Sequence, residues 1–137
     1  MITALVTKEK ISVDSLAESL KSKQAGAVAS FSGDVRDNDA DKDVTSLTYE
    51  IHPTAQSVIE EITHRIAAKH DVLGVAVAHR YGEIAIGETA FAVVVSAVHR
   101  GPAFAACEEI VSTVKDELPI WKYQVFADGT TEWVNSA

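Results

Sequence analysis

The sequence of 137 residues has few of the residue types that mark several large classes of protein. Its one cysteine, Cys107, excludes an internal disulfide and therefore a disulfide-stapled secreted domain. Three prolines and seven glycines are too few for a low-complexity linker. No apolar run is long and uninterrupted enough to span a bilayer, and charge follows the apolar N-terminus instead of preceding it as in a signal peptide. We expect a protein of the reducing cytoplasm that does not enter a membrane.

Positive charge is also scarce. Twelve Lys and Arg residues stand against 20 Asp and Glu residues, which gives a formal net charge of −8 and a sequence pI near 5.0. A broad basic surface for nucleic acid or anionic lipid is therefore absent, and we expect neither as a partner. The length and the 47% share of hydrophobic residues predict one compact domain over residues 1–137.

The hydrophobic pattern predicts an α+β fold with a largely antiparallel sheet, about three packed helices and a C-terminal hairpin. Strand-like patterns cover residues 2–6, 27–31, 47–51, 72–78, 84–86, 91–98, 122–126 and 130–134. The last two flank Asp128-Gly129, a tight-hairpin signal. Residues 37–43 are rich in aspartate and are expected to form a polar loop.

Three helices are expected, each with a recognisable boundary. The first follows Ser12 as N-cap and stops by Gly26, and the second has Pro53 in its first turn. The third opens at Gly101-Pro102 and ends at Pro119, which cannot continue a helix. The face of the second helix that turns inward is predicted as Ala55, Val58, Ile59, Ile62 and Ile66, and that of the third as Phe104, Cys107, Val111, Val114 and Leu118.

The few cations of the C-terminal half lie beside predicted element boundaries. After Lys69 the chain has only Arg80, Arg100, Lys115 and Lys122, against nine acidic residues. Arg80 and Arg100 each follow a histidine at a predicted strand end, where a rigid scaffold presents side chains to ligands. Arginine offers a planar fork for phosphate, and a lysine near other cations can lose its proton. Converging cations would bind a small phosphorylated substrate and supply an acid or base.

Each of these residues also has a structural interpretation. Lys115 could complement the dipole at a helix C-terminus, and Lys122 could protect an edge strand from aggregation. His79 and His99 could be hydrogen-bonded structural histidines, since their spacing does not resemble a metal site. Cys107 is expected to be a buried structural thiol. The aspartates of residues 37–43 lack the ordered spacing of a calcium loop, so neither a metal nor a cofactor is predicted.

Several stretches together resemble the large, catalytic subunit of molybdopterin synthase. The similarity extends over nearly the whole chain and is most specific in three of its motifs, H-R-x-G, S-A-x-H-R-x-x-A-F and K-x-x-x-P-I-W-K. The stretches are residues 26–36 (GAVASFSGDVR), 47–50 (LTYE), 79–82 (HRYG), 87–88 (GE), 96–104 (SAVHRGPAF) and 115–122 (KDELPIWK). This resemblance implies the α/β-hammerhead fold of that subunit.

The resemblance also implies an activity, a sulfurtransferase step in molybdenum cofactor biosynthesis. Cyclic pyranopterin monophosphate would receive two sulfurs and become the dithiolene molybdopterin. The sulfur would come from a ubiquitin-like small subunit whose C-terminal Gly-Gly carries a thiocarboxylate. The implied assembly is a homodimer of large subunits with a small subunit at each end, a heterotetramer.

Carried over by position, the resemblance implies roles for two lysines. Lys115 is expected to be the principal catalytic residue, donating or accepting a proton while sulfur attacks and the pterin ring opens, and a transient covalent adduct on it is conceivable. Lys122 is expected to share the pocket and to lower the pKa of Lys115 by like-charge repulsion. Arg80 is a weaker candidate with a structural alternative.

The substrate-contacting residues implied by the resemblance come from four places in the chain. Arg36 would offer charge to the phosphate, and His99 and Arg100 would do likewise from the end of their strand. The complete set is Asp34, Val35, Arg36, His99, Arg100, Lys115, Lys122, Tyr123 and Gln124.

The sequence departs from the family pattern in two places. Tyr123-Gln124 stand where family members often have a basic residue and a glutamate, which removes one cation and one carboxylate. The sequence stops four residues after Trp133, where relatives often continue with a charged tail.

Two other functions stay open. The chain could be a non-catalytic module that binds an anion or an acidic tail, because fold does not guarantee chemistry. It could also be a sulfurtransferase that depends on Cys107.

Overall fold

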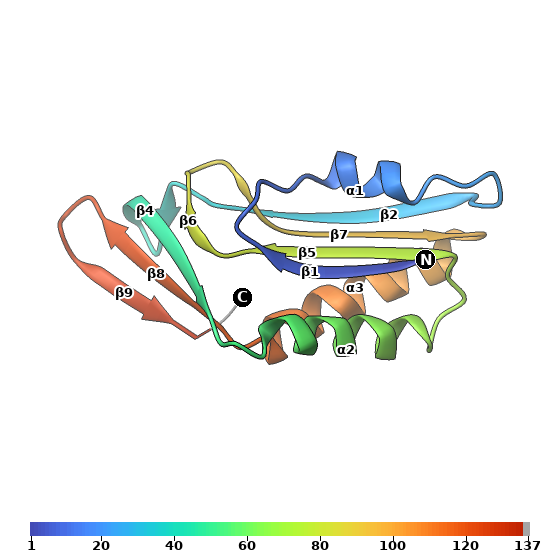
Figure 1. Ribbon diagram of the computed structural model, residues 1–137. Coiled ribbons are helices and arrows are strands. Elements are labelled where there is room, and N and C mark those ends of the chain that lie inside the picture. Colours follow the sequence, from blue (N-terminus) through green and yellow to red (C-terminus); the bar gives the residue numbers. More distant parts are fainter. Residues whose placement is uncertain (136–137) are drawn as a thin grey trace.

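The computed structural model describes residues 1–135 and arranges them as two β-sheets and three helices (Figure 1). The elements are β1 (Ile2–Thr7), α1 (Val13–Ser19), β2 (Ala27–Asp34), β3 (Asn38–Asp39), β4 (Lys42–Ile51), α2 (Ala55–Ala67), β5 (Gly74–Arg80), β6 (Gly82–Ile84), β7 (Thr89–Ala97), α3 (Arg100–Glu117), β8 (Ile120–Phe126) and β9 (Thr131–Val134).

The first sheet has four strands in the order β1-β5-β7-β2. The β1–β5 pair is parallel, whereas β5–β7 and β7–β2 are antiparallel. The second sheet has the order β3-β4-β8-β9, with β6 attached to β4, and all its pairs are antiparallel. The predicted α+β class with a largely antiparallel sheet is confirmed, although the strands divide between two sheets instead of forming one.

The two central strands of the four-stranded sheet, β5 and β7, are covered on both faces. Figure 1 shows α1 on one face and α2 with α3 on the other. Every residue of β5 is buried, and so is every residue of β7 after Thr89. This explains why both strands have nearly continuous apolar sequences instead of alternating ones.

Helix α2 packs its predicted face against the sheet. Ile59 and Ile62 are fully buried and Ile66 nearly so, and each such side chain stabilises the fold by roughly 1.5–3 kcal/mol. Pro53 lies outside the helix, because Thr54 is the N-cap. The expected position of Pro53 in the first turn is therefore wrong by two residues.

The inward face predicted for helix α3 is confirmed at Cys107, Val114 and Leu118 but not at Phe104. Its buried residues are Ala103, Ala106, Cys107, Ile110 and Val114. Phe104, which was expected inside, is 64% exposed. The buried set recurs at intervals of three and four residues from Ala103, and Phe104 lies about 100° around the helix from that residue. The large apolar side chain of Phe104 suggested an inward position, but the small Ala103 occupies it.

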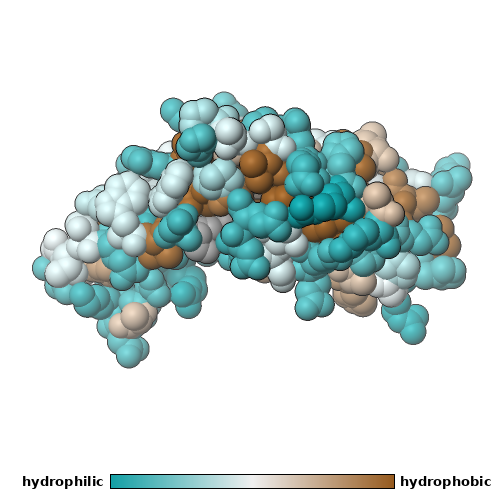
Figure 2. All heavy atoms as spheres, turned by 90° about the horizontal axis from the view of Figure 1, so that it is seen from below, coloured by the Kyte–Doolittle hydropathy of each residue, from teal (hydrophilic) through white to brown (hydrophobic). Residues whose placement is uncertain are grey.

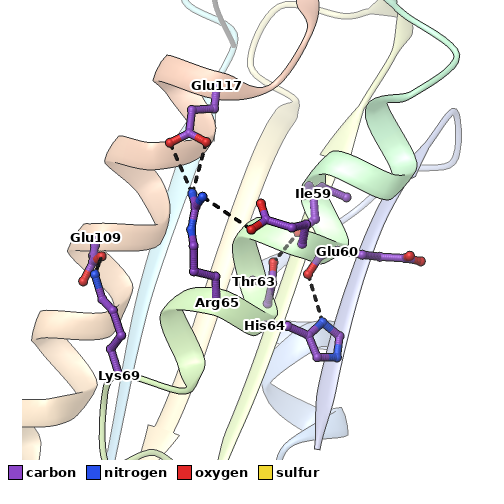
Figure 3. Close-up of polar contacts among 9 residues, drawn as sticks. Ile59, Glu60, Thr63, His64, Arg65, Lys69, Glu109 and Glu117 are labelled. Atoms are coloured by element: carbon purple, nitrogen blue, oxygen red, sulfur yellow. Dashed lines mark hydrogen bonds and ion pairs between the residues drawn. The ribbon is translucent and has the colours of Figure 1, made fainter.

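Polar side chains link α2 to α3 along their exposed edges (Figure 3). Arg65 donates from Nη2 to both carboxylate oxygens of Glu117 at 3.1 and 3.2 Å. Lys69 forms an ion pair with Glu109, which also bonds His70 at 2.9 Å. Exposed pairs of this kind stabilise a protein little, and the Arg65–Glu117 pair lies at the C-terminal end of α3.

The expected polar loop over residues 37–43 is instead largely a short hairpin. Asn38 and Asp39 in β3 pair with Asp43 and Lys42 at the start of β4. Ala40 and Asp41 form its tip with φ values of 50° and 65°. Such left-handed conformations close a tight turn but are uncommon for alanine. The turn brings Asp39 back toward β8.

The face that carries α2 and α3 is mainly hydrophilic, with smaller hydrophobic patches between the polar side chains (Figure 2). Within residues 1–135, none of the helices is both long enough and apolar enough to cross a bilayer. The exposed large apolar side chains with the highest accessibility, apart from Met1, are Phe104, Val28 and Trp133.

Gly26 holds the start of β2 close to the end of β7, and it does not stop a helix as expected, because α1 already ends at Ser19. Its amide donates to the Ala97 carbonyl at 3.1 Å. A Cβ at this position would lie 2.5 Å from the carbonyl oxygen of Val98. Real Cβ atoms do not approach backbone oxygen so closely, so any larger residue would separate the two strands.

Gly26→Ala is therefore expected to lower the free energy of unfolding by about 1–3 kcal/mol, the usual cost of overpacking. Gly101→Ala is the matched control, since a Cβ there meets no atom within 4 Å. That substitution lies in the first turn of α3 and should leave stability unchanged or raise it by less than about 1 kcal/mol. Urea denaturation of both variants checks the prediction, and equal effects would contradict it.

Candidate active site

A cavity of about 180 Å³ lies where the two sheets meet. Its walls come from the end of β2 and the following residues, the start of β7, the last turn of α3, and strands β3, β4, β5 and β8. The lining residues are Gly33, Asp34, Val35, Arg36, Asn38, Asp39, Leu47, Tyr49, His79, Ala90, Phe91, Lys115, Lys122 and Gln124. Six of the nine residues expected to contact substrate are among them.

Lys115 enters the cavity from the last turn of α3. Partial burial, and to a smaller extent the charge of Lys122, lower the pKa of its amine. The direction agrees with the expected effect of a second lysine, although burial is the larger cause. Lys115 therefore has the property of an acid or base that works nearer neutral pH than an ordinary lysine.

Lys122 and Gln124 reach the cavity from β8 because alternate residues of a strand point to the same face. Tyr123 lies between them and points to the opposite face, where its ring packs against Trp133 with centroids 4.8 Å apart. Tyr123 was expected to line the cavity but is not among its lining residues. Strand β8 lies between β4 and β9, so the alternative of an edge-protecting Lys122 is wrong.

Asp34, Val35 and Arg36 line the cavity just after a register shift at the end of β2. Asp34 accepts hydrogen bonds from the hydroxyls of Ser32 and Thr89 at 2.7 and 2.8 Å. The backbone of Val35 bonds on both sides to the segment before β7, with Glu88 accepting at 3.0 Å. The side chain of Arg36 is 77% exposed. This arginine is free to turn toward an incoming anion.

Asp39 is a site residue that the sequence did not reveal. Its Oδ2 accepts a hydrogen bond from the amide of Gln124 at 2.7 Å, and Arg36 lies 3.7 Å from its Oδ1. The Gln124 hydrogen bond, and secondarily the charges of Lys122 and Arg36, lower the pKa of this carboxyl. The available signal was the run of turn-forming residues that folds the segment back, but it was interpreted as a solvated loop.

His79 forms part of the cavity wall and is fully buried. Its ring stacks on Phe91 at 5.2 Å and meets Tyr49 edge-on at 4.9 Å. Nδ1 lies 2.7 Å from the carbonyl oxygen of Arg80. Because that oxygen can only accept, Nδ1 carries the hydrogen. Burial, together with the charge of Lys115, lowers the pKa of His79 to about 4, so the ring is neutral at pH 7.

His99 and Arg100 are not brought to this cavity, although both were expected to contact substrate. They form the N-cap and first residue of α3, and Lys115 lies about 24 Å further along the same helix. The ends of β5 and β7 were both expected to present side chains to a ligand. The strands are antiparallel, so the end of β5 lies beside the start of β7, with His79 opposite Phe91.

Arg80 and Cys107 also lie outside the cavity walls. Arg80 is 7% exposed and its Nη1 lies 3.5 Å from Glu88. This supports the structural interpretation of Arg80. Cys107 is buried on α3, and burial raises the pKa of its thiol. A protonated, buried thiol is a poor nucleophile.

The geometry defines what the cavity can do chemically. Arg36, Lys115 and Lys122 supply positive charge for an anionic ligand, and Lys115 can exchange a proton. Among residues 1–135 no group of three or more His, Cys, Asp or Glu side chains could hold a metal ion. The structure thus supports anion binding combined with proton transfer by an amine.

Comparison with known proteins gives consistent matches. Residues 6–117 match the family described as MoaE protein. A molybdopterin synthase catalytic subunit of Aspergillus niger is 40% identical over 115 residues, which make up 83% of this chain and 64% of that protein. Molybdopterin synthase catalytic subunit 1 of Mycobacterium tuberculosis is 38% identical over 130 residues, covering 94% of this chain and 88% of that protein.

The fold is matched as well. The crystal structure of molybdopterin synthase from Staphylococcus aureus superimposes with a TM-score of 0.86 at 28% sequence identity, covering 94% of both chains. The present chain spans just under two thirds of the length of the Aspergillus niger relative and most of the length of the other two.

The buried neutral histidine predicts a specific pH dependence of stability. The pKa of His79 is about 4 in the folded protein and 6.5 in an unperturbed chain. The unfolded state therefore binds the additional proton between these values, and stability falls as the pH is lowered through them. From pH 7 to pH 5 this group should remove about 2 kcal/mol of unfolding free energy.

The measurement is urea denaturation at pH 7, 6 and 5 for the wild type and for His79→Phe, which keeps an aromatic ring. The carboxyl groups lose their stabilising effect at lower pH, and they do so in both proteins. The slope between pH 7 and pH 5 should therefore be flatter in His79→Phe. Parallel slopes would show that His79 does not titrate in this way.

Proposed function

The chain belongs to the MoaE protein family, and from this premise we propose that it is the catalytic subunit of a molybdopterin synthase. It would transfer sulfur from a thiocarboxylated small subunit to cyclic pyranopterin monophosphate. The product is the dithiolene of molybdopterin, an intermediate of molybdenum cofactor biosynthesis. The names of the relatives support this proposal, since a catalytic subunit implies a second subunit in the enzyme.

The observation that carries the proposal is the convergence of two lysines on one cavity. Lys115 comes from the end of α3 and Lys122 from β8, and the pKa of Lys115 is lowered by burial and by Lys122. Such an amine can give a proton to a leaving oxygen and take one from an attacking group. A structural lysine that only complements a helix dipole requires no such neighbour.

The other cavity residues suit the binding of a phosphorylated substrate. Arg36 and Lys122 would bind the phosphate, with the exposed guanidinium of Arg36 closing over it. The hydrogen-bonded carboxylates of Asp34 and Asp39 are acceptors for N–H groups, of which a pterin ring presents several. Gln124 holds Asp39 in place and would contact the substrate beside it. Val35 would line the entrance.

The sulfur would be delivered by the partner and not held on this chain. Cys107 is the only cysteine, and it is buried about 12 Å along α3 from Lys115. A thiol that stays protonated and does not line the cavity cannot relay sulfur to a substrate bound there. These facts disfavour the alternative of a sulfurtransferase that depends on Cys107.

His99 and Arg100 can contact the substrate only across an interface between two copies of the chain. In the proposed homodimer, itself the centre of a heterotetramer, they would enter the cavity of the neighbouring copy. Val98 and Phe104, which flank them, are 44% and 64% exposed. Exposed apolar side chains on both sides of a cationic pair are typical of a protein interface. We place this assembly in the cytoplasm, where a lone cysteine and a thiocarboxylate both stay reduced.

Lys115→Ala is expected to lower the rate of dithiolene formation by about 10²–10⁴-fold, the usual contribution of a general acid or base. The assay mixes the variant with a thiocarboxylated ubiquitin-like protein and cyclic pyranopterin monophosphate. Substrate binding, followed separately by calorimetry, should weaken much less because Arg36 and Lys122 remain. Full product formation by Lys115→Ala would refute its catalytic role.

Cys107→Ser is the matched control on the same helix. It should keep the wild-type rate, since the thiol neither lines the cavity nor ionises readily. Loss of activity in Cys107→Ser with retention in Lys115→Ala would favour the cysteine mechanism. Substrate binding without product in the wild type would favour a non-catalytic anion-binding module.

Mixing two inactive variants tests the shared site. Lys115→Ala and Arg100→Ala should each be inactive as homodimers. After subunit exchange, half of the dimers are mixed and each contains one cavity with both residues intact, so activity should recover to about a quarter of the wild-type value. No recovery, in a mixture shown to exchange subunits, would contradict the proposed contact across the interface.

A further inference from the structure

His79 presents a buried hydrogen-bonding atom for which the fold provides no partner. Its Nε2 is inaccessible to solvent and makes no hydrogen bond within residues 1–135. Buried polar atoms are normally paired, and an exception requires an explanation. The hydrogen bond to the Arg80 carbonyl gives Nδ1 a structural use, but no such bond accounts for Nε2. The unpaired nitrogen therefore indicates a role beyond packing.

The neighbours of the ring determine what this nitrogen can do. Nδ1 carries the hydrogen, because it donates to the Arg80 carbonyl at 2.7 Å. Nε2 therefore has a bare lone pair and can only accept. Phe91 and Tyr49 pack on the ring from two sides, so it cannot flip to exchange the two nitrogens without disturbing the core.

Two carboxyl groups of the cavity already accept hydrogen bonds. The Oδ1 of Asp34 accepts from Ser32 and Thr89, and the Oδ2 of Asp39 accepts from Gln124. Arg36, Lys115 and Lys122 are donors when charged. Lys115 and His79 line the same cavity, and the charge of Lys115 contributes to the lowered pKa of the imidazole.

We propose that His79 is a positioning residue for Lys115, and that its Nε2 accepts a hydrogen bond from the Lys115 amine when substrate fills the cavity. The proposal rests on the catalytic role proposed above for that lysine. A neutral acceptor directs the amine without adding a fourth positive charge beside Arg36, Lys115 and Lys122. It also opposes the effects of burial and of Lys122 on the amine, because it favours the ammonium form.

The test follows the protonation of Lys115 directly and does not need turnover. NMR of lysine labelled at Cε and Nζ, assigned with Lys115→Arg, gives the titration midpoint of this amine in the presence of bound inorganic phosphate. In His79→Phe the midpoint should move down by about one pH unit, a tenfold change in proton affinity. In His79→Gln, whose amide oxygen can still accept, it should stay close to the wild-type value.

Phe31→Leu is the matched control for packing. Phe31 packs edge-on against Phe91 at 5.6 Å, so this change loosens the ring stack but leaves the acceptor in place. It should not move the Lys115 midpoint. An unchanged midpoint in His79→Phe, an equal shift in His79→Gln, or an equal shift in Phe31→Leu would each overturn the proposal. Because no step requires sulfur transfer, these outcomes are separate from failure of the proposed activity.

Discussion

The antiparallel pairing of β5 with β7 is the constraint on which the rest of the structure depends. Both strands are buried on both faces, so they need α1 on one side of the sheet and α2 with α3 on the other. Their register sets His79, at the end of β5, opposite Phe91, near the start of β7. The second sheet joins at this end of the strands, and the cavity lies there. A slip by one residue would turn His79 to the other face and remove it from the cavity wall.

The second requirement is the direct connection from α3 to β8. Leu118 caps the helix, Pro119 prevents its continuation, and Ile120 already begins the strand. The carbonyl of Pro119 accepts a hydrogen bond from His52 at 3.0 Å, and Leu118 and Ile120 are both buried. The two lysines on either side of this connection are thus carried by rigid elements, as a precise site requires.

The fold class and most elements could be predicted from the sequence, because period and turn chemistry are local properties. The end of α3 at Pro119 and the hairpin around Asp128-Gly129 are examples. The β1–β5 pairing could not be predicted, because it joins segments some seventy residues apart and no local pattern records which strands meet.

The site was predicted in part for the same reason. Lys115 and Lys122 were found because one short segment contains both. His99 and Arg100 do not line the cavity of their own chain, because they follow β7 and the end of that strand lies beside the start of β5, away from His79. Asp39 was missed because its contact with Gln124 crosses from β3 to β8. His79 was noted beside Arg80, but nothing in the sequence shows that its Nε2 would be buried without a partner.

The cations that line the cavity repel one another, and the surrounding residues reduce this repulsion. Three positive side chains attract an anion. Each of these charges also lowers the pKa of a neighbouring lysine, because a like charge disfavours the protonated amine. Hydrogen bonds hold the carboxyl groups of Asp34 and Asp39 in place, while burial keeps His79 neutral. Among the three cations, the exposed Arg36 stays charged whatever its surroundings. Partial burial lowers the pKa of Lys115. Arg36 can therefore hold an anion while Lys115 exchanges a proton.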